Sequence, residues 1–113
     1  AGAFPTWLAP VQVRVLTVSD QFTEYGQRVV DRLRTRFIRA ELGSASDTVS
    51  KKIREGTTQK IPNLVVVGER EAQNSTVTLR RYGIEKQETL TLDALERTLV
   101  EAIAQRSLEL PLS

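Results

Sequence analysis

Two side chains in the second half of this 113-residue chain have the chemistry needed to recognise a nucleic-acid base. The carboxylate of Glu71 can accept two hydrogen bonds from the Watson–Crick edge of guanine, which single-stranded RNA exposes. The guanidinium of Arg80 has a fork of donors that matches guanine O6 and N7. Each also has a plain structural explanation. Glu71 forms with Glu69 a pair of solvated turn acids, and Arg80 extends toward solvent at a sheet edge. The residue pattern alone leaves both explanations open.

The absence of histidine and cysteine removes most other kinds of site. Without imidazole or thiolate there is no Ser-His or Cys-His nucleophile, no disulfide and no His/Cys zinc site. No Gly-x-Gly-x-x-Gly follows a predicted strand and no Gly-Lys-Ser/Thr occurs, so a nucleotide-phosphate cradle is not supported. Asp20 after the first predicted strand suggests a phospho-acceptor receiver domain, but Gly68 stands where that fold needs an acceptor aspartate. We expect no catalytic residue.

The distribution of charge favours a phosphate-bearing partner. The formal net charge is +2, but residues 28–60 contain nine cationic and four acidic side chains, so that segment carries +5 and the remainder −3. A domain with one basic half is suited to bind a nucleic-acid backbone. The structural alternative is a solvated helix face with scattered charges.

Alternating and helical periods predict the elements that position these residues. An unbroken apolar run at 64–68 is typical of a strand covered on both faces, as in a parallel sheet. The connection 69–74 is polar and too short for a crossover, so the next strand should run antiparallel. Apolar residues from Phe22 to Phe37 fall at helical spacing and predict one buried stripe. The predicted strands are 11–18, 38–42, 64–68, 76–82 and 87–90. Three helices are predicted. The first follows Ser19-Asp20, the second begins at Ser46 or Asp47 and ends near Gly56, and the third follows Thr91.

This order predicts a three-layer α/β/α domain with a five-stranded mixed sheet flanked by three helices. Ligands of such sheets bind outside the carboxyl ends of the parallel strands, where Ser46 and Glu71 should lie. We expect a domain over residues 11–106, preceded by a junction at 1–10 and followed by a frayed terminus at 107–113.

Several runs of residues resemble one family. Residues 4–13 read Phe-Pro-Thr-Trp-Leu-Ala-Pro-Val-Gln-Val, which resembles the junction in threonyl-tRNA synthetases where the class II catalytic domain leads into the C-terminal anticodon-binding domain. Similar later segments are Lys52-Ile53-Arg54-Glu55, Lys60-Ile61-Pro62, Val66-Val67-Gly68 with Glu71, and Leu79-Arg80. The resemblance extends to about Arg106.

The resemblance implies recognition of the guanine and uracil shared by threonine anticodons. The family's base-reading glutamate falls on Glu71 and its base-reading arginine on Arg80. A third reader, often asparagine, falls on Ser46, whose shorter reach is a departure from the family. The lysine and arginine of the Lys-Ile-Arg stretch fall on Lys52 and Arg54. We expect Lys51, Lys52 and Arg54 to project outward from the second helix toward RNA.

For the whole protein, the resemblance implies an ATP-dependent threonine–tRNA ligase, cytoplasmic and homodimeric mainly through its catalytic domain. ATP, magnesium and zinc would be bound there, so this fragment should be monomeric, inactive and without a cofactor. The expected partners are threonine tRNA and the catalytic domain of the same chain. No apolar run approaches the roughly 20 residues of a membrane helix, so no membrane partner is expected. A synthetase-like regulatory paralogue and a general RNA-hairpin binder remain as alternatives.

Overall fold

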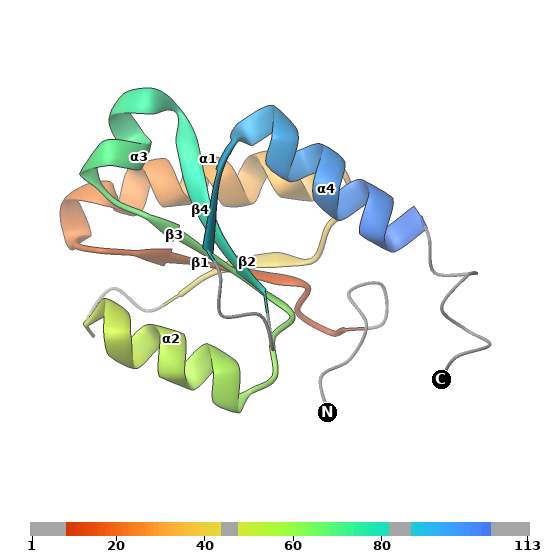
Figure 1. The fold of residues 1–113 in the computed structure, drawn as a ribbon, viewed down its shortest axis with the longest axis horizontal. Coiled ribbons are helices and arrows are strands. Elements are labelled where there is room, and N and C mark those ends of the chain that lie inside the picture. Colours follow the sequence, from red (N-terminus) through yellow and green to blue (C-terminus); the bar gives the residue numbers. More distant parts are fainter. Residues whose placement is uncertain (1–8, 44–47, 82–86, 105–113) are drawn as a thin grey trace.

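The structure, a computed structural model, describes residues 9–43, 48–81 and 87–104 (Figure 1). The described part of the chain contains five strands, as the sequence predicts, with a helix after each strand except the fourth. In chain order the elements are β1 (Val13–Thr17), the short 3-10 helix η2 (Asp20–Phe22), α1 (Thr23–Arg34), β2 (Ala40–Leu42), α2 (Val49–Thr58), β3 (Asn63–Val67), α3 (Glu69–Asn74), β4 (Thr76–Arg81), β5 (Gln87–Thr91) and α4 (Leu92–Ala104).

The strands form one mixed sheet in the order β2-β1-β3-β4-β5. β1 pairs in parallel with β2 and β3, whereas the β3–β4 and β4–β5 pairs are antiparallel. The predicted arrangement of three parallel strands followed by an antiparallel hairpin is therefore confirmed. The helices α1 and α4 cover one face of the sheet and α2 covers part of the other, which confirms the three layers (Figure 1).

The predicted number of helices is wrong, because the supposed polar turn 69–74 forms the helix α3. Gly68 precedes this helix in an extended conformation, and Glu71 occupies its third position. The backbone N–H of Gly68 donates to Glu71 Oε1 at 2.7 Å. This bond satisfies an amide that the start of a helix would otherwise leave unpaired, so a short segment without an apolar stripe can become helical.

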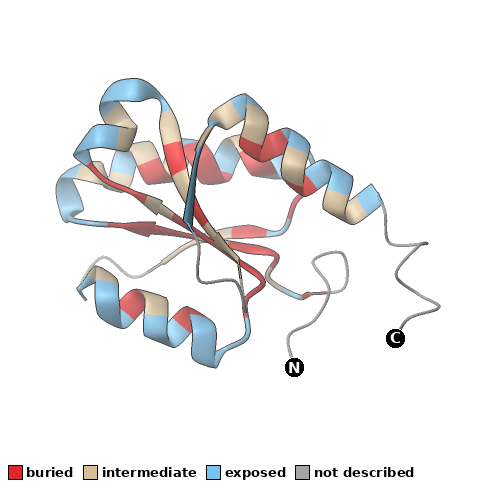
Figure 2. Ribbon diagram, in the orientation of Figure 1, coloured by how far each residue is buried: buried red, intermediate tan, exposed pale blue. Residues whose placement is uncertain are grey.

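The main core lies between the sheet and the α1–α4 layer (Figure 2). Its strand residues come from alternate positions, because side chains of a strand point to opposite faces in turn. A smaller cluster of Leu16, Ile61 and Leu64 lies under α2. Truncating a leucine or isoleucine in such a core to alanine typically costs about 2–5 kcal/mol. The main cluster consists of Val13, Val15, Val29, Val30, Leu33, Ile38, Ala40, Val65, Val67, Val77, Leu79, Leu95 and Leu99.

The start of α2 differs from the prediction. Thr48 is the N-cap, and its side chain accepts a hydrogen bond from the Lys51 amide. Ser46 and Asp47, the predicted caps, lie outside the described residues. At the start of α4, by contrast, the predicted cap is confirmed, since the Ala94 amide donates to Thr91 Oγ1 at 3.1 Å.

Gly56 lies inside α2 rather than ending it as predicted. It is buried, and a Cβ at this position would lie only 2.6 Å from Leu64 Cδ2. The absence of a side chain therefore lets α2 approach β3 closely, and the helix continues to Thr58.

The end of α1 contradicts the prediction that Phe37 belongs to the buried stripe. Phe37 N–H donates to the carbonyl of Arg34 and Ile38 N–H to that of Leu33, at 2.9 and 3.2 Å. These bonds form a Schellman motif, in which Phe37 occupies the left-handed position that usually carries glycine, with φ 62°. Phe37 is 91% exposed, whereas Ile38 and Leu33 are buried. The motif turns the chain before the stripe can extend to Phe37, at a backbone cost of about 1–2 kcal/mol.

Candidate nucleic-acid interface on the open half of the sheet

Among the residues that the structure describes, no helix covers one half of the α2 face of the sheet. α2 packs on β1, with Ile53 against the cluster of Leu16, Ile61 and Leu64. Across the β3–β4 ladder, Leu64 pairs with Arg80 and Val66 with Thr78, and paired residues point to the same face. Thr78 and Arg80 therefore point to the α2 side, but beyond the helix. With their partners on β5, they form what we call the open half-sheet: Thr78, Arg80, Gln87 and Thr89.

Glu71 lies at one end of the open half-sheet, held by two hydrogen bonds. Its Oε1 accepts from the Gly68 amide at 2.7 Å, and its Oε2 accepts from Thr78 Oγ1 at 3.2 Å. A carboxylate offers about four acceptor sites, so these two bonds fix the orientation and leave further lone pairs for a ligand. Glu69 is exposed, and its carboxylate accepts a long hydrogen bond from Gln73, at 3.4 Å. The two acids therefore do not act as a pair, and Glu71 alone faces the open half-sheet.

Arg80 lies in the middle of the same surface. It is half-buried, between Leu64 on β3 and Gln87 on β5. Within the described part of the chain, no carboxylate forms an ion pair with its guanidinium. Arg80 is two residues from Thr78 on one strand, a spacing of about 6.8 Å along that face. The structure thus brings Glu71, Thr78 and Arg80 into one row, and of these three the sequence predicts Glu71 and Arg80, but not Thr78, as ligand-binding residues.

Tyr25 of α1 is a neighbour of this row that the sequence indicates only as a core residue. Its hydroxyl donates to the Thr76 carbonyl at 2.7 Å, which ties α1 to the start of β4. Burial raises the pKa of Tyr25, and the negative charge of Glu71 raises it further. The phenol is therefore neutral at physiological pH and remains a donor to β4.

The predicted basic face of α2 is only partly present. Lys51 and Arg54 are exposed on the outer side of the helix. The flank of α2 that carries Lys52, Glu55 and Gln59 faces Arg14 and Glu41 at the β2 edge. By helical geometry, Arg54 lies on the other flank, toward the open half-sheet. Its cation is thus on the same side of α2 as the open half-sheet.

The expectation that Lys52 projects outward is wrong. Lys52 is only 3% exposed, and its Nζ donates to the carbonyl oxygen of Thr17 at 2.9 Å. A phosphate contact by this lysine would require that bond to be given up. Of the three cationic side chains of α2, Lys51 and Arg54 are exposed, whereas Lys52 is buried. Ser46, the third expected base reader, lies outside the described residues.

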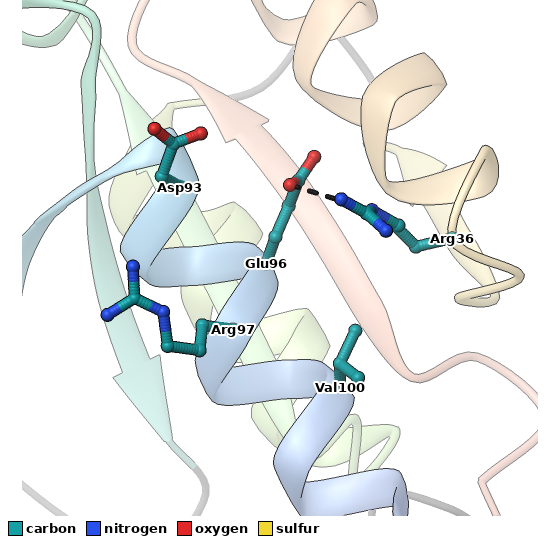
Figure 3. A pocket seen from close by; sticks show the side chains of 5 residues that line it. All are labelled: Arg36, Asp93, Glu96, Arg97 and Val100. Carbon is teal, nitrogen blue, oxygen red and sulfur yellow. Dashed lines mark ion pairs between the residues drawn. The ribbon is translucent and has the colours of Figure 1, made fainter.

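A pocket of about 330 Å³ between α1 and α4 belongs to the other layer of the molecule (Figure 3). It is lined by Arg36, Asp93, Glu96, Arg97 and Val100. Glu96 Oε1 accepts from Arg32 Nε at 2.5 Å, Arg32 also pairs with Asp93, and Arg36 Nε lies 3.7 Å from Glu96 Oε2.

These ion pairs connect the two helices. The hydrogen bond that Arg32 donates to Glu96 is the main cause of the raised pKa of Arg32. The helices α1 and α4 lie on the opposite side of the sheet from α2 (Figure 1), so the pocket that they line is not part of the candidate interface. No helix in the described residues is long and apolar enough to cross a membrane.

Comparisons with known proteins agree with a nucleic-acid interface. Residues 12–102 match the family described as "Anticodon binding domain". The chain is 48% identical over 84 residues to the threonine–tRNA ligase of Carboxydothermus hydrogenoformans, which covers 74% of this chain and 13% of that protein. It is 46% identical over 109 residues to that of Gloeobacter violaceus, 95% of this chain and 17% of that protein.

A solved structure is also similar: the RNA-binding domain of threonyl-tRNA synthetase from Cryptosporidium parvum. It superimposes with a TM-score of 0.85 at 35% identity, covering 89% of this chain and 26% of that one. The chain thus spans less than a fifth of the length of the two curated relatives.

Proposed function

The chain belongs to the family of anticodon-binding domains, and from this we propose that it selects threonine tRNA for a threonine–tRNA ligase of which it forms one domain. One observation carries the proposal: Glu71, with its carboxylate fixed by Gly68 and Thr78, shares an open surface with Arg80, a guanidinium without a carboxylate partner among the described residues. An oriented acceptor and a forked donor are the two groups that distinguish guanine from the other bases.

The hydrogen-bonding pattern of guanine fits this pair. The remaining lone pairs of Glu71 would accept from guanine N1–H and the exocyclic amine, while Arg80 would donate to the acceptor edge. Adenine presents an acceptor where Glu71 needs a donor. The carboxylate would then lose its water without gaining a partner, which is costly. Guanine should therefore be selected mainly by the cost of binding the wrong base.

Phosphate attraction would supply affinity without sequence preference. Lys51 and Arg54 are exposed on α2, and Arg54 lies on the flank toward the open half-sheet. Cations that neutralise phosphates release counterions, so binding should weaken as salt rises. We assign base selection to Glu71 and Arg80, backbone attraction to Lys51 and Arg54, and contact with the anticodon uracil to Ser46.

The remaining functions of a ligase would reside outside this chain. ATP, magnesium and zinc would be bound by the catalytic part of the parent protein, together with the dimer interface, in the cytoplasm. The 113-residue chain would be a monomer without aminoacylation activity. The relatives at 46–48% identity are ligases, so a regulatory RNA-binding paralogue is not favoured.

The direct test is to titrate the 113-residue chain with a threonine anticodon stem-loop, and with the same hairpin carrying adenine in place of the middle guanine. We expect tighter binding of the native loop by at least about fivefold at fixed salt, since one good base contact contributes about 1–3 kcal/mol of discrimination. Equal affinity for the two hairpins would contradict base reading. Such a result would mean that the domain binds RNA only through its phosphate backbone, without sequence preference.

A further inference from the structure

Gln87 of β5 lies beside Arg80 on the open half-sheet, but the guanine site makes no use of it. In the ladders of the sheet, Arg80 is paired with Leu64 on one side and with Gln87 on the other. The side toward Leu64 is closed by α2, since a Cβ at Gly56 would lie only 2.6 Å from Leu64 Cδ2. A ligand that extends past Arg80 on the side away from α2 therefore meets Gln87.

The side chain of Gln87 is free to serve such a ligand. It is exposed, and within the described part of the chain it takes part in no hydrogen bond. Other glutamines of the domain are used by the fold. Gln59 Oε1 accepts from Arg14 at 2.7 Å, and Gln12 Oε1 accepts from the Arg39 amide at 2.8 Å. The carboxamide of Gln87 thus keeps all its donors and acceptors for a partner and can rotate.

Hydrogen bonding rather than stacking is the chemistry that this part of the surface offers. Proteins that hold single-stranded bases without preference usually stack them on aromatic side chains. The open half-sheet consists of Thr78, Arg80, Gln87 and Thr89, all of them polar and none aromatic. Residues opposite each other on paired strands have Cβ atoms about 4.5–5.5 Å apart, so Gln87 is within reach of the nucleotide next to one held by Arg80. That nucleotide would be held through the edge of its base.

A carboxamide can pair with the edge of any base. Its oxygen accepts and its NH₂ group donates side by side, and a half-turn about the last bond exchanges the two. The Watson–Crick edge of every base, which single-stranded RNA exposes, likewise has a donor next to an acceptor. Gln87 can therefore form a pair of hydrogen bonds with each of the four bases. A carboxylate such as Glu71 matches only guanine, which alone presents two adjacent donors.

We propose that Gln87 binds the base of the first anticodon nucleotide without selecting it. The two neighbours of the middle guanine make different demands on the domain. The uracil shared by threonine anticodons has to be distinguished from cytosine, which a rotating carboxamide cannot do. The first base is not shared, so its site has to accept different bases, and Gln87 has the chemistry for that. The proposal rests on the proposed function, because it takes the guanine to be bound by Glu71 and Arg80.

The test is a titration of the 113-residue chain with four threonine anticodon stem-loops that differ only in the first base. The wild type should bind the four loops with similar affinity. Gln87→Ala should weaken binding of all four by about two- to tenfold, because the hydrogen bonds to the base are lost. Gln87→Glu should create a selective site. It should bind the loop with guanine first more tightly than the loop with adenine first by at least about fivefold, as expected for one good base contact.

Glu88→Gln is the matched control, because Glu88 is the exposed neighbour on β5 and is paired with Leu79 on the other face of the sheet. It should leave the relative affinities of the four loops unchanged. Unaltered binding by Gln87→Ala, or a Gln87→Glu variant without a first-base preference, would overturn the proposal. A wild type that prefers one first base by more than about fivefold would overturn the claim that Gln87 does not select.

A different role for Gln87 would also be visible. If Gln87→Ala lowered only the preference for guanine over adenine at the middle position, while the four first-base loops bound as before, Gln87 would orient Arg80 and the proposal would be wrong. Failure of the proposed function has its own signature. It would appear in the wild type, as equal affinity for loops that carry guanine or adenine at the middle position.

Discussion

The hydroxyl of Thr78 donates to Oε2 of Glu71 at 3.2 Å, and this bond places the carboxylate at the end of the strand that carries Arg80. Gly68 holds the other oxygen, so the carboxylate cannot rotate freely about its last bond. An acceptor with a fixed direction loses less conformational entropy on binding than a mobile one. The short helix α3, where the sequence predicts only a polar turn, supplies this arrangement.

Glu71→Gln and Arg80→Lys should each reduce the preference for guanine over adenine at the middle anticodon position. Glutamine keeps the size and an acceptor for the Gly68 amide but loses the charge, and lysine keeps the charge but cannot form the fork. Each substitution should lower this preference by about 1–3 kcal/mol, which corresponds to a roughly 5- to 150-fold smaller ratio of guanine to adenine aminoacylation. The measurement is aminoacylation of native and adenine-substituted tRNA by the full-length enzyme carrying each change.

Glu69→Gln provides the control for that series, because Glu69 is the neighbouring exposed acid and does not face the open half-sheet. It should leave the guanine-to-adenine ratio unchanged. If neither Glu71→Gln nor Arg80→Lys moves the ratio, base reading lies elsewhere on the domain.

Thr78→Val should weaken discrimination without preventing RNA binding. Valine keeps the branched shape but removes the donor to Glu71 Oε2, so the carboxylate becomes less well oriented. A hydrogen bond of this kind contributes about 0.5–1.5 kcal/mol, which corresponds to roughly a two- to tenfold smaller ratio of guanine to adenine binding. Thr89→Val, across the ladder on β5, is the matched control. Equal ratios for the two variants would show that Thr78 has no orienting role.

The sheet could be predicted from sequence because its signals are local. The unbroken apolar run before Gly68 indicates a strand buried on both faces, and β3 is that strand. The alternation in β4 places Arg80 and Thr78 on one face, as the register confirms. The role of Thr78 could not be derived in the same way. That role depends on a tertiary contact, because α3 places the Glu71 carboxylate beside Thr78 of β4.

The two wrong predictions about side-chain exposure have different causes. Phe37 fits the helical period of α1, but a period does not show where a helix ends, and no glycine marks this Schellman motif. The charge of Lys52 favours a solvated side chain. Its spacing to Val49, Ile53 and Gly56 nevertheless places it on the inward face of α2. That spacing is a usable signal, but the Thr17 carbonyl that satisfies the ammonium is not visible in the sequence.

Neutralising Lys51 and Arg54 together, as Lys51→Gln and Arg54→Gln, should weaken binding to any tRNA by a similar factor. Both side chains are exposed on α2, and phosphate contacts carry no base preference. The slope of log affinity against log salt should become shallower by about 0.7 for each phosphate that the variant no longer neutralises. The measurement is a salt titration with the threonine stem-loop and an unrelated hairpin. An unchanged slope would place the RNA backbone on another surface.

Lys52→Met should affect stability rather than salt dependence. Methionine keeps an unbranched stem of similar length but leaves the Thr17 carbonyl without its buried donor. We expect a loss of about 1–3 kcal/mol in the free energy of unfolding, measured by urea denaturation. Lys51→Met, one residue away on the exposed side, should change the free energy of unfolding by less than about 0.5 kcal/mol. A salt slope that falls in Lys52→Met while stability is retained would restore Lys52 to the RNA surface.

Tyr25 should make the stability of the domain sensitive to alkaline pH. Burial, with the charge of Glu71, raises its pKa above the ordinary value of 10.0, so the folded state holds the phenolic proton more tightly than the unfolded state. Below pH 10 both states are protonated and the contribution is complete. As pH rises above 10 the unfolded state loses its proton first, and the stability falls until the folded phenol also ionises.

Tyr25→Phe isolates this effect from the other groups that titrate in the same range. The variant lacks the hydrogen bond to the Thr76 carbonyl, so at pH 8 it should be about 0.5–1.5 kcal/mol less stable than the wild type. Between pH 9 and 11 the difference between the two proteins should shrink, because only the wild type carries the penalty of ionising a buried phenol. The measurement is the urea midpoint of both proteins at each pH. A difference that stays constant across that range would mean that Tyr25 ionises as easily in the folded domain as in the unfolded chain.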